Sequence, residues 1–183
     1  MVYGEDRPMN SKARILLFTG DGKGKTTAAL GIVLRAVGHQ MATCIIQFIK
    51  HDGSTGEIAA LGHLPHVSIQ QMGLGFVPSA THSAFLNHRF AAREALKTAQ
   101  AIIRSRHYQV VVFDEICNAI ARKLITQKAV VTMLKSAPGN KIIVLTGRGA
   151  PKSLIDVADT VTEMKCIKHG FQKGRLAEKG AEF

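Results

Sequence analysis

The chain has 183 residues, of which 46% are hydrophobic and 20% charged, and its formal net charge is +11. This composition is typical of one folded globular domain and excludes a disordered chain. No apolar run approaches the roughly 18–20 residues of a membrane-spanning helix. The first ten residues lack the pattern of a secretory signal, and Cys44, Cys117 and Cys166 form no CxxC pair. We therefore expect a reduced cytoplasmic protein with no membrane partner.

The positive charge raises the question of a nucleic-acid partner. Basic residues gather in residues 83–107 and 165–183. No RRM, KH or zinc-finger pattern accompanies them, and the chain has no tryptophan and only two tyrosines with which to stack bases. The charge therefore favours a solvent-exposed basic face, or attraction of a small polyanion, and we expect no nucleic-acid ligand.

Short apolar runs alternate with longer helical stretches along the chain, which predicts an α/β fold with a mostly parallel sheet of about six strands and helices on both faces. Strands are predicted at residues 14–19, 42–48, 67–71, 110–113, 141–145 and 160–164. Gly-, Ser- and Pro-rich loops are predicted at residues 51–57 and 72–81. Such loops at the carboxyl ends of strands surround the ligand in doubly wound sheets.

Two helices show a clear apolar periodicity. The helix at residues 25–38 is predicted to bury a stripe of Leu30, Val33, Leu34 and Val37. The helix at residues 83–107 is predicted to bury Phe85, Ala92, Leu96, Ala99 and Ile103.

The segment TGDGKGKTT, residues 19–27, joins the first strand to the first helix. Its glycines let backbone N–H groups turn toward phosphate oxygens, and the positive end of the helix dipole adds to this attraction. Lys25 supplies a mobile cation and Thr26 a hydroxyl for bound magnesium, although Thr19 stands where the GxxxxGK(S/T) template has glycine. The segment predicts a phosphate-binding loop made of Gly20, Asp21, Gly22, Lys23, Gly24, Lys25, Thr26 and Thr27.

The second motif is VVVFDE, an apolar strand that ends in Asp114 and Glu115. In P-loop folds such acids lie opposite the phosphate loop and hold magnesium directly or through water. We expect one acid to contact the metal and the other to anchor the turn. The two motifs together predict ATP-type nucleotide binding with Mg²⁺ (or Mn²⁺), but they leave open whether phosphoryl transfer, hydrolysis, or nucleotidyl or adenosyl transfer follows.

A longer series of motifs narrows these alternatives. It runs in the order TGDGKGKTTAALGIVLRAVGH, IIQFIK, GLGF, VVVFDEI, LTGRGAPKSLIDVADTVTEM, KHGF and KGAEF from residue 19 to residue 183. Together these segments resemble the P-loop family of ATP:corrinoid adenosyltransferases, the cob(I)alamin adenosyltransferases. The segment LTGRGAPKSLIDVADTVTEM is the part most specific to that family, and a threonine at position 19 is normal in the family. The resemblance implies a P-loop NTPase-like (RecA-like) fold spanning residues 1–183 as one domain, with 1–13 as an extension and 165–183 as a tail near the site.

The resemblance implies that reduced corrinoid cobalt, Co(I), attacks the 5′ carbon of ATP and releases tripolyphosphate. The product is adenosylcobalamin, adenosylcobinamide or adenosylcobyrinate diamide. Because Co(I) is a strong nucleophile, no protein base is needed, and catalysis reduces to positioning and neutralising the leaving group. The alternatives are a P-loop small-molecule kinase or ATPase, which would release ADP, and a nucleic-acid-stimulated RecA-like ATPase.

Carried over to this chain, the resemblance makes Lys25 and Glu115 the catalytic residues. Thr26 and Glu115 would hold magnesium. Asp114 would either support these ligands without contacting the metal or bind the metal itself. Arg148 of the TGR segment is a candidate phosphate contact, with a structural ion pair as the alternative. Lys50, after IIQF, lies at another strand end, where it would face either substrate.

The resemblance also implies that the GLGF loop presents an apolar wedge to the corrinoid. The wedge would be Phe76, Val77 and Pro78, which exclude an axial ligand and so ease reduction of Co(II) to Co(I). Relatives often place tryptophan where this chain has Pro78, and the chain has none. The structural alternative is a loop phenylalanine that covers the core. A reduced flavoprotein or similar electron donor and association into a homodimer are further expectations from the family.

Overall fold

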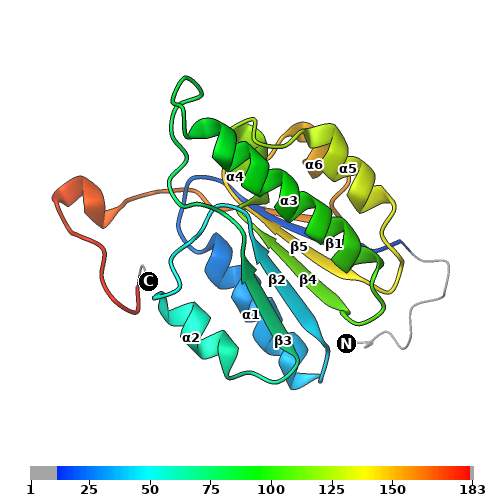
Figure 1. The fold of residues 1–183 in the computed structure, drawn as a ribbon. Helices are drawn as coiled ribbons and strands as arrows, with labels where there is room; N and C mark the ends of the chain where they lie inside the picture. Colours follow the sequence, from blue (N-terminus) through cyan, green and yellow to red (C-terminus); the bar gives the residue numbers. More distant parts are fainter. Residues whose placement is uncertain (1–11, 182–183) are drawn as a thin grey trace.

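The computed structural model describes residues 12–181. Its strands form one sheet in the order β3-β2-β4-β5-β1-β6, and every neighbouring pair is parallel (Figure 1). The strands are β1 (Arg14–Thr19), β2 (Thr43–Gln47), β3 (Val67–Gln71), β4 (Val110–Asp114), β5 (Ile142–Thr146) and β6 (Thr160–Glu163). The six-stranded parallel architecture is confirmed. The expected N-terminal extension lies outside the described residues except for its last two positions.

Helices cover both faces of the sheet, as expected. Figure 1 shows α1 and α2 on one face and α3 to α6 on the other. The helices are α1 (Lys25–Gly38), α2 (Gly56–Gly62), α3 (Phe85–Arg104), α4 (Ile116–Ala121), α5 (Gln127–Lys135) and α6 (Lys152–Ile155), followed by the 3₁₀ turn η1 (Gly170–Lys173). The pattern does not predict α2, α4, α5 and α6, because short helices show too few turns of periodicity. None of the described helices is long and apolar enough to cross a membrane.

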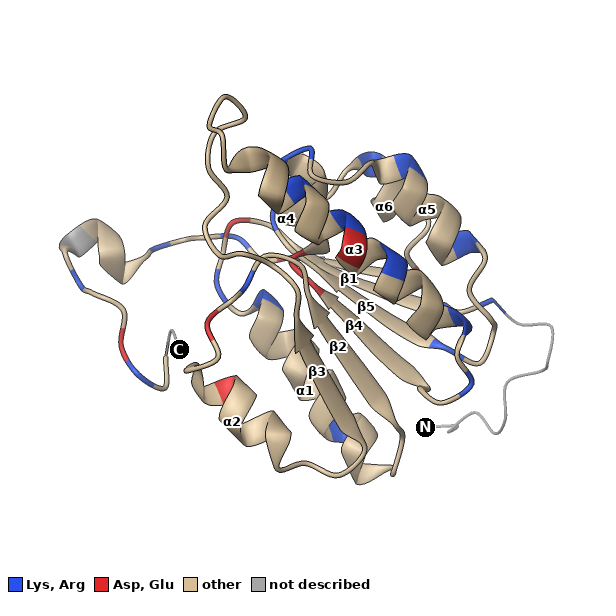
Figure 2. Ribbon diagram, viewed as in Figure 1, with Lys and Arg blue, Asp and Glu red and all other residues tan. Residues whose placement is uncertain are grey.

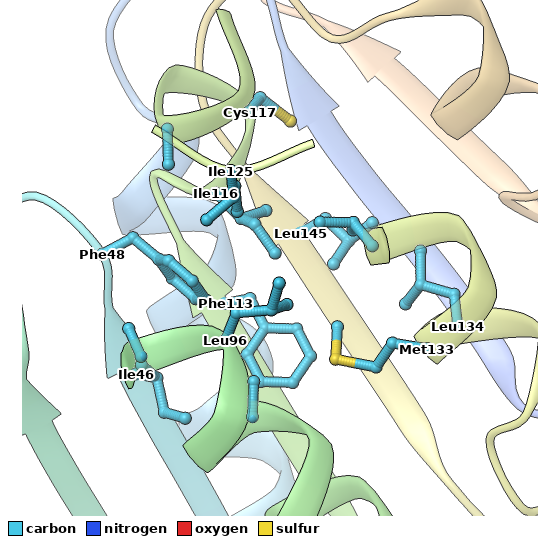
Figure 3. Close-up of a cluster of buried hydrophobic side chains, with 14 of the residues drawn as sticks. Ile46, Phe48, Leu96, Phe113, Ile116, Cys117, Ile125, Met133, Leu134 and Leu145 are labelled. Carbon is cyan, nitrogen blue, oxygen red and sulfur yellow. The ribbon is translucent and has the colours of Figure 1, made fainter. Parts of the chain in front are cut away.

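The larger hydrophobic cluster lies between the sheet and the helices α3 to α6 (Figure 3). Phe48 and Phe113 meet edge-on there, with ring centroids 6.2 Å apart, a favourable aromatic geometry. The predicted α3 seam is confirmed, since all five of its residues are buried. This packing anchors the strand that ends in Asp114.

Helix α1 packs on the opposite face, where the predicted stripe is wrong at one position. The residues it buries are Ala29, Val33 and Ala36, whereas Leu34 is 63% exposed. Ala29 and Ala36 have small side chains, so the helix axis lies close to the sheet where they are buried. The periodic pattern selects large apolar residues and therefore misses these two alanines. The N-terminus of α1 is thereby held against the sheet edge.

Strand β5 lies between β1 and β4, so the phosphate loop and the acidic strand end are not on neighbouring strands. Because all strands are parallel, their carboxyl ends nevertheless share one edge of the sheet. Loops from β1, β2, β4 and β5 therefore converge at this edge, and the candidate site is built there.

Candidate functional site

The phosphate loop follows β1 and ends at the first turn of α1. Gly20 and Gly24 have φ angles of 93° and 100°, a region that favours glycine. A Cβ atom on Gly22 would lie 2.8 Å from the carbonyl oxygens of Met164 and Lys165. One side of the loop is therefore packed against the chain that follows β6. The Gly22 N–H donates a 2.7 Å hydrogen bond to Met164, so it does not point toward phosphate as the motif predicts.

Asp114 links the phosphate loop to the other strands of the site. It is 1% exposed, and its Oδ1 accepts hydrogen bonds from Thr26 at 2.9 Å and from Thr146 at 2.6 Å. Its Oδ2 accepts a 3.1 Å hydrogen bond from Gln47, and the Lys50 ammonium lies 3.7 Å away. With four polar partners, Asp114 anchors the neighbouring side chains rather than facing the cavity.

Glu115 faces the cavity from a strained backbone. Its φ angle is 61°, which is rare for a residue with a side chain and is often found at functional sites. Its N–H donates a 2.8 Å hydrogen bond to the Thr146 hydroxyl. Burial, and then the neighbouring Asp114 charge, raise the pKa of Glu115 to about 7. A cation bound beside it would relieve this penalty.

Lys25 and Arg148 are two of the cations on the phosphate side of the site. The Lys25 ammonium donates to the carbonyl oxygen of Gly22, within the loop. Burial, and then the Arg148 charge, lower the pKa of Lys25. The Arg148 N–H donates a 2.6 Å hydrogen bond to Asn118 Oδ1, and its side chain is exposed. These cations provide a positive field for an anion.

A cavity of about 770 Å³ lies over the phosphate loop, a volume typical of nucleotide-sized ligands. The structure brings most of the predicted phosphate contacts to its wall, together with the predicted metal ligand Glu115: Gly22, Lys23, Gly24, Lys25, Thr26, Thr27 and Arg148. Gly20 does not line it. Asp21 lines a separate cavity of about 410 Å³, which it shares with Arg148.

A second cavity of about 660 Å³ adjoins the first and shares Lys50, Glu57 and Glu115 with it. Phe76 lines this cavity and is 86% exposed, so it does not cover the core. Val77, by contrast, is buried in the hydrophobic core, and its side chain is not available to a ligand. Pro78 is half-buried and does not line the cavity. Of the predicted wedge, only Phe76 faces this space.

Several site residues are not singled out by the sequence motifs. Glu57 binds Lys50 through a 2.9 Å ion pair and stands at the start of α2, within a segment predicted only as a loop. Gln47 and Thr146 are polar residues at the carboxyl ends of otherwise apolar strands. That position is the signal by which they could have been found, because this edge of a parallel sheet carries the ligand.

The C-terminal tail returns to the phosphate loop. Lys23 donates a 3.1 Å hydrogen bond to the carbonyl oxygen of Ala181, and Gly180 and Ala181 line the nucleotide-sized cavity. A further cavity of about 900 Å³ lies between the loop and the tail, with His169 and Phe171 in its wall. The last two residues of the KGAEF motif, Glu182 and Phe183, lie outside the described residues.

Figure 2 shows acidic and basic residues side by side at the carboxyl ends of the strands, while α3 and α5 carry mostly basic residues. Both kinds of charge line the cavity over the phosphate loop, with Lys25 and Lys50 beside Glu57 and Glu115. This arrangement suits a bound polyphosphate with its counter-ion.

Comparison with known structures supports the fold. Flagellar accessory protein FlaH from Methanocaldococcus jannaschii superposes with a TM-score of 0.53 at 12% sequence identity, over 82% of this chain and 70% of that chain. At such low identity the likeness concerns the fold alone.

Comparison of sequences identifies the family. Residues 11–183 match the family model of ATP:corrinoid adenosyltransferase BtuR/CobO/CobP. The corrinoid adenosyltransferase of Pseudomonas aeruginosa is 38% identical over 170 residues, which are 92% of this chain and 83% of the relative. That of Escherichia coli K12 is 35% identical over 92% of this chain and 85% of the relative. The family motifs, the phosphate loop and the sequence match agree, and the chain belongs to the ATP:corrinoid adenosyltransferase family.

Proposed function

We propose that this enzyme transfers the 5′-deoxyadenosyl group of ATP to the Co(I) centre of a corrinoid and releases tripolyphosphate. The observation that carries the proposal is the pair of adjoining cavities, one over a phosphate loop and one beside an exposed phenylalanine. Their shared wall contains Lys50, Glu57 and Glu115. An alkyl transfer needs two substrate sites that meet at the reacting carbon.

In this proposal the triphosphate lies in the cavity over the phosphate loop. Lys23, Lys25 and Arg148 neutralise its charge, and the N-terminus of α1 adds its dipole. The triphosphate is bound in the orientation that directs C5′, rather than the terminal phosphorus, toward the second cavity. This orientation is inferred from the family.

Magnesium fits the donor set at the end of the loop. Thr26, Asp114 and Glu115 offer hydroxyl and carboxylate oxygens, the ligands that Mg²⁺ prefers. Among the described residues no group of three or more His, Cys, Asp or Glu side chains is placed to hold a metal alone, which suits an ion shared with phosphate oxygens. We propose that Thr26 and Glu115 hold the ion and that Asp114 orients Thr26; once bound, the ion neutralises charge on the departing polyphosphate.

The corrinoid is proposed to occupy the second cavity, with Phe76 against its face. Phe76 is a large apolar side chain held in an exposed position, where it would exclude water or another axial ligand from cobalt. Removing an axial ligand favours the lower oxidation state of a metal centre. Pro78 stiffens the loop that presents Phe76, because its ring restricts the backbone.

Reduction of Co(II) needs an electron from outside this chain, and we propose a reduced flavoprotein or a similar carrier as the donor. The net charge of +11 suits an acidic partner of this kind. We also propose that the chain acts as a single domain, with residues 165–183 as a tail near the site, and that it associates as a homodimer. We propose the cytoplasm as its compartment, since all three cysteines are free thiols and ATP is the substrate.

An anaerobic assay tests the proposed reaction. The purified protein is mixed with ATP, Mg²⁺ and chemically reduced cob(I)alamin, and the absorbance change on forming the cobalt–carbon bond is followed. Phosphorus NMR identifies the released phosphate product. Tripolyphosphate formed only with reduced corrinoid supports adenosyl transfer. Release of ADP would instead indicate a kinase or ATPase, and hydrolysis stimulated by polynucleotide a nucleic-acid-dependent ATPase.

A further inference from the structure

Lys50 occupies the boundary between the two cavities. It follows β2 by three residues, so its backbone lies at the carboxyl edge of the sheet. Its side chain is 28% exposed and lines both the cavity over the phosphate loop and the cavity that contains Phe76. Among the described lysines and arginines that line the first cavity, Lys50 alone also lines the second.

Two carboxylates hold the Lys50 ammonium at this boundary. Glu57 Oε1 lies 2.9 Å from Nζ, and Asp114 Oδ2 lies 3.7 Å from it. Glu57 is at the start of α2, whereas Asp114 ends β4 and binds Thr26 of the phosphate loop. Carboxylates from two elements thus position the ammonium, as a preorganised charge requires.

Lys50 is a cation in this setting. Burial opposes its charged form, but the charges of Asp114 and Glu57 raise its pKa above the ordinary value. An ammonium group has three donors; Glu57 accepts one of them, and the Lys50 side chain lines both cavities.

We propose that Lys50 is a catalytic residue that stabilises the negative charge on the departing oxygen O5′ of ATP. This inference rests on the proposed function. In that reaction the electron pair of Co(I) forms the cobalt–C5′ bond, and the electron pair of the C5′–O5′ bond leaves with O5′. Cobalt is formally oxidised to Co(III), no proton is transferred, and tripolyphosphate gains one negative charge. The bond breaks where the two cavities meet, which is where the Lys50 ammonium lies.

The other cations of the site are less suited to this role. Lys23 lines the cavity over the phosphate loop but not the one with Phe76, and it donates to the Ala181 carbonyl of the tail. Lys25 donates within the phosphate loop, to the Gly22 carbonyl. Arg148 lines the smaller cavity with Asp21 rather than the one with Phe76. All three are placed to bind the phosphates of ATP before and after the reaction, whereas Lys50 faces the charge that appears only as the bond breaks. An interaction that strengthens in the transition state raises kcat more than affinity.

The test compares Lys50→Met with wild type under single-turnover conditions, using chemically reduced cob(I)alamin so that electron supply does not limit the rate. We expect the rate of adenosylation to fall by about 100- to 1,000-fold, while the Kd of ATP changes by less than about threefold. Lys50→Arg, which keeps the charge, is expected to recover part of the rate. A rate loss below about threefold for Lys50→Met, or an equal loss in rate and ATP affinity, overturns the proposal.

Glu57→Gln is the matched control for a purely structural role. It breaks the same ion pair but leaves the lysine, so its rate loss is expected to stay below about tenfold. If Glu57→Gln loses as much rate as Lys50→Met, Lys50 acts only as a counter-ion to Glu57 and the proposal is overturned.

Binding of tripolyphosphate gives a second readout that needs no turnover. The product carries the extra charge at the oxygen that Lys50 faces, so Lys50→Met is expected to raise the Kd of tripolyphosphate by about tenfold, more than that of ATP. An equal effect on both ligands overturns the proposal. If Lys50→Met does not fold, Lys50→Gln takes its place with the same required outcomes. Absence of adenosyl transfer by the wild type would count against the proposed function itself, whereas an active wild type with an unaffected Lys50 variant removes only the role of Lys50.

Discussion

The Thr146 hydroxyl donates a 2.6 Å hydrogen bond to Asp114 Oδ1 and accepts a 2.8 Å hydrogen bond from the Glu115 N–H. Thr146 ends β5, which lies between the strand of the phosphate loop and the strand of the two acids. A single hydroxyl therefore contacts both the Asp114 carboxylate and the Glu115 backbone, whose φ angle is positive. The middle strand connects the two halves of the site.

Replacing Thr146 by valine removes both hydrogen bonds at nearly constant volume. We expect Thr146→Val to lower the free energy of unfolding by about 1–3 kcal/mol, because it removes one of the two hydrogen bonds to buried Asp114 Oδ1 and the hydrogen bond of the part-buried Glu115 N–H. Urea denaturation at pH 7.5 measures this change. Thr146→Ser keeps the hydroxyl and is the control. Equal stability of the valine variant and the wild type would contradict the connecting role.

Lys25→Ala is expected to reduce kcat/KM by at least about 100-fold, because it removes a charge that neutralises the leaving polyphosphate. The free energy of unfolding should change by less than about 1 kcal/mol, since Lys25 lies at the rim of the cavity rather than in the core. The anaerobic adenosylation assay and urea denaturation check the two outcomes. Near wild-type turnover would show that the assigned role of Lys25 is wrong.

Gly22→Ala is expected to destabilise the protein by about 1–3 kcal/mol, since the added Cβ meets two carbonyl oxygens at 2.8 Å. ATP binding should weaken with it, because the loop can no longer pack against the chain after β6. Gly31→Ala in α1 is the matched control: apart from the neighbouring backbone of the helix, no atom lies within 4 Å of its Cβ position, and we expect a gain of about 0.5–1 kcal/mol. Thermal unfolding and ATP titration distinguish the two variants, and equal effects would rule out the steric argument.

Phe76→Ala is expected to slow adenosylation that starts from Co(II) under a mild reductant by about tenfold or more, and to spare the reaction from chemically prepared Co(I). The reason is that an apolar group that excludes an axial ligand acts on reduction and not on alkyl transfer. Phe90→Ala is the control, since Phe90 is 67% exposed on α3 and lines no described cavity. Equal losses in both assays would count against the wedge.

The raised pKa of Glu115 makes stability depend on pH. Between pH 4.5, its ordinary pKa, and about 7 the folded protein keeps a proton that the unfolded chain has released, so the free energy of unfolding falls as the pH rises through this range. We expect Glu115→Gln to raise the free energy of unfolding by about 2–3 kcal/mol at pH 8 and to change it little at pH 4. Urea denaturation at both pH values, without metal or nucleotide, tests this prediction.

Glu57→Gln is the control for this prediction, because its effect on the free energy of unfolding is expected to have the opposite sign. Burial opposes ionisation of Glu57, but the hydrogen bond from Lys50 lowers its pKa. Its carboxylate therefore contributes stability above its ordinary pKa of 4.5, and this contribution is lost as the pH falls through the lower folded value. Glu57→Gln should thus be destabilising at pH 8. The same sign of effect for both variants would contradict the assigned electrostatics.

The motifs proposed to bind phosphate and metal could be predicted from the sequence, because each consists of residues that are close together in the chain. The glycines around Lys25, the hydroxyl of Thr26 and the strand that ends in Asp114 and Glu115 all depend on neighbours in the chain and on the carboxyl ends of parallel strands. Leu34 shows where this approach fails. A periodic pattern identifies large apolar residues, but in the structure the small residues Ala29 and Ala36 are buried against the sheet and Leu34 is exposed. Which residues are buried depends on the shape of the sheet surface that the helix packs on.

Sequence alone determined the family, the parallel α/β architecture and the phosphate loop, since these follow from periodicity and from contiguous motifs. Only the tertiary structure decided that β5 separates the two motif strands, that Gly22 donates to Met164, that Val77 is buried while Phe76 is exposed, and that Lys50 stands between two cavities. Each of these depends on contacts between segments far apart in the chain. Strand order and side-chain direction are set by which surfaces bury one another, and that information is not contained in any single segment.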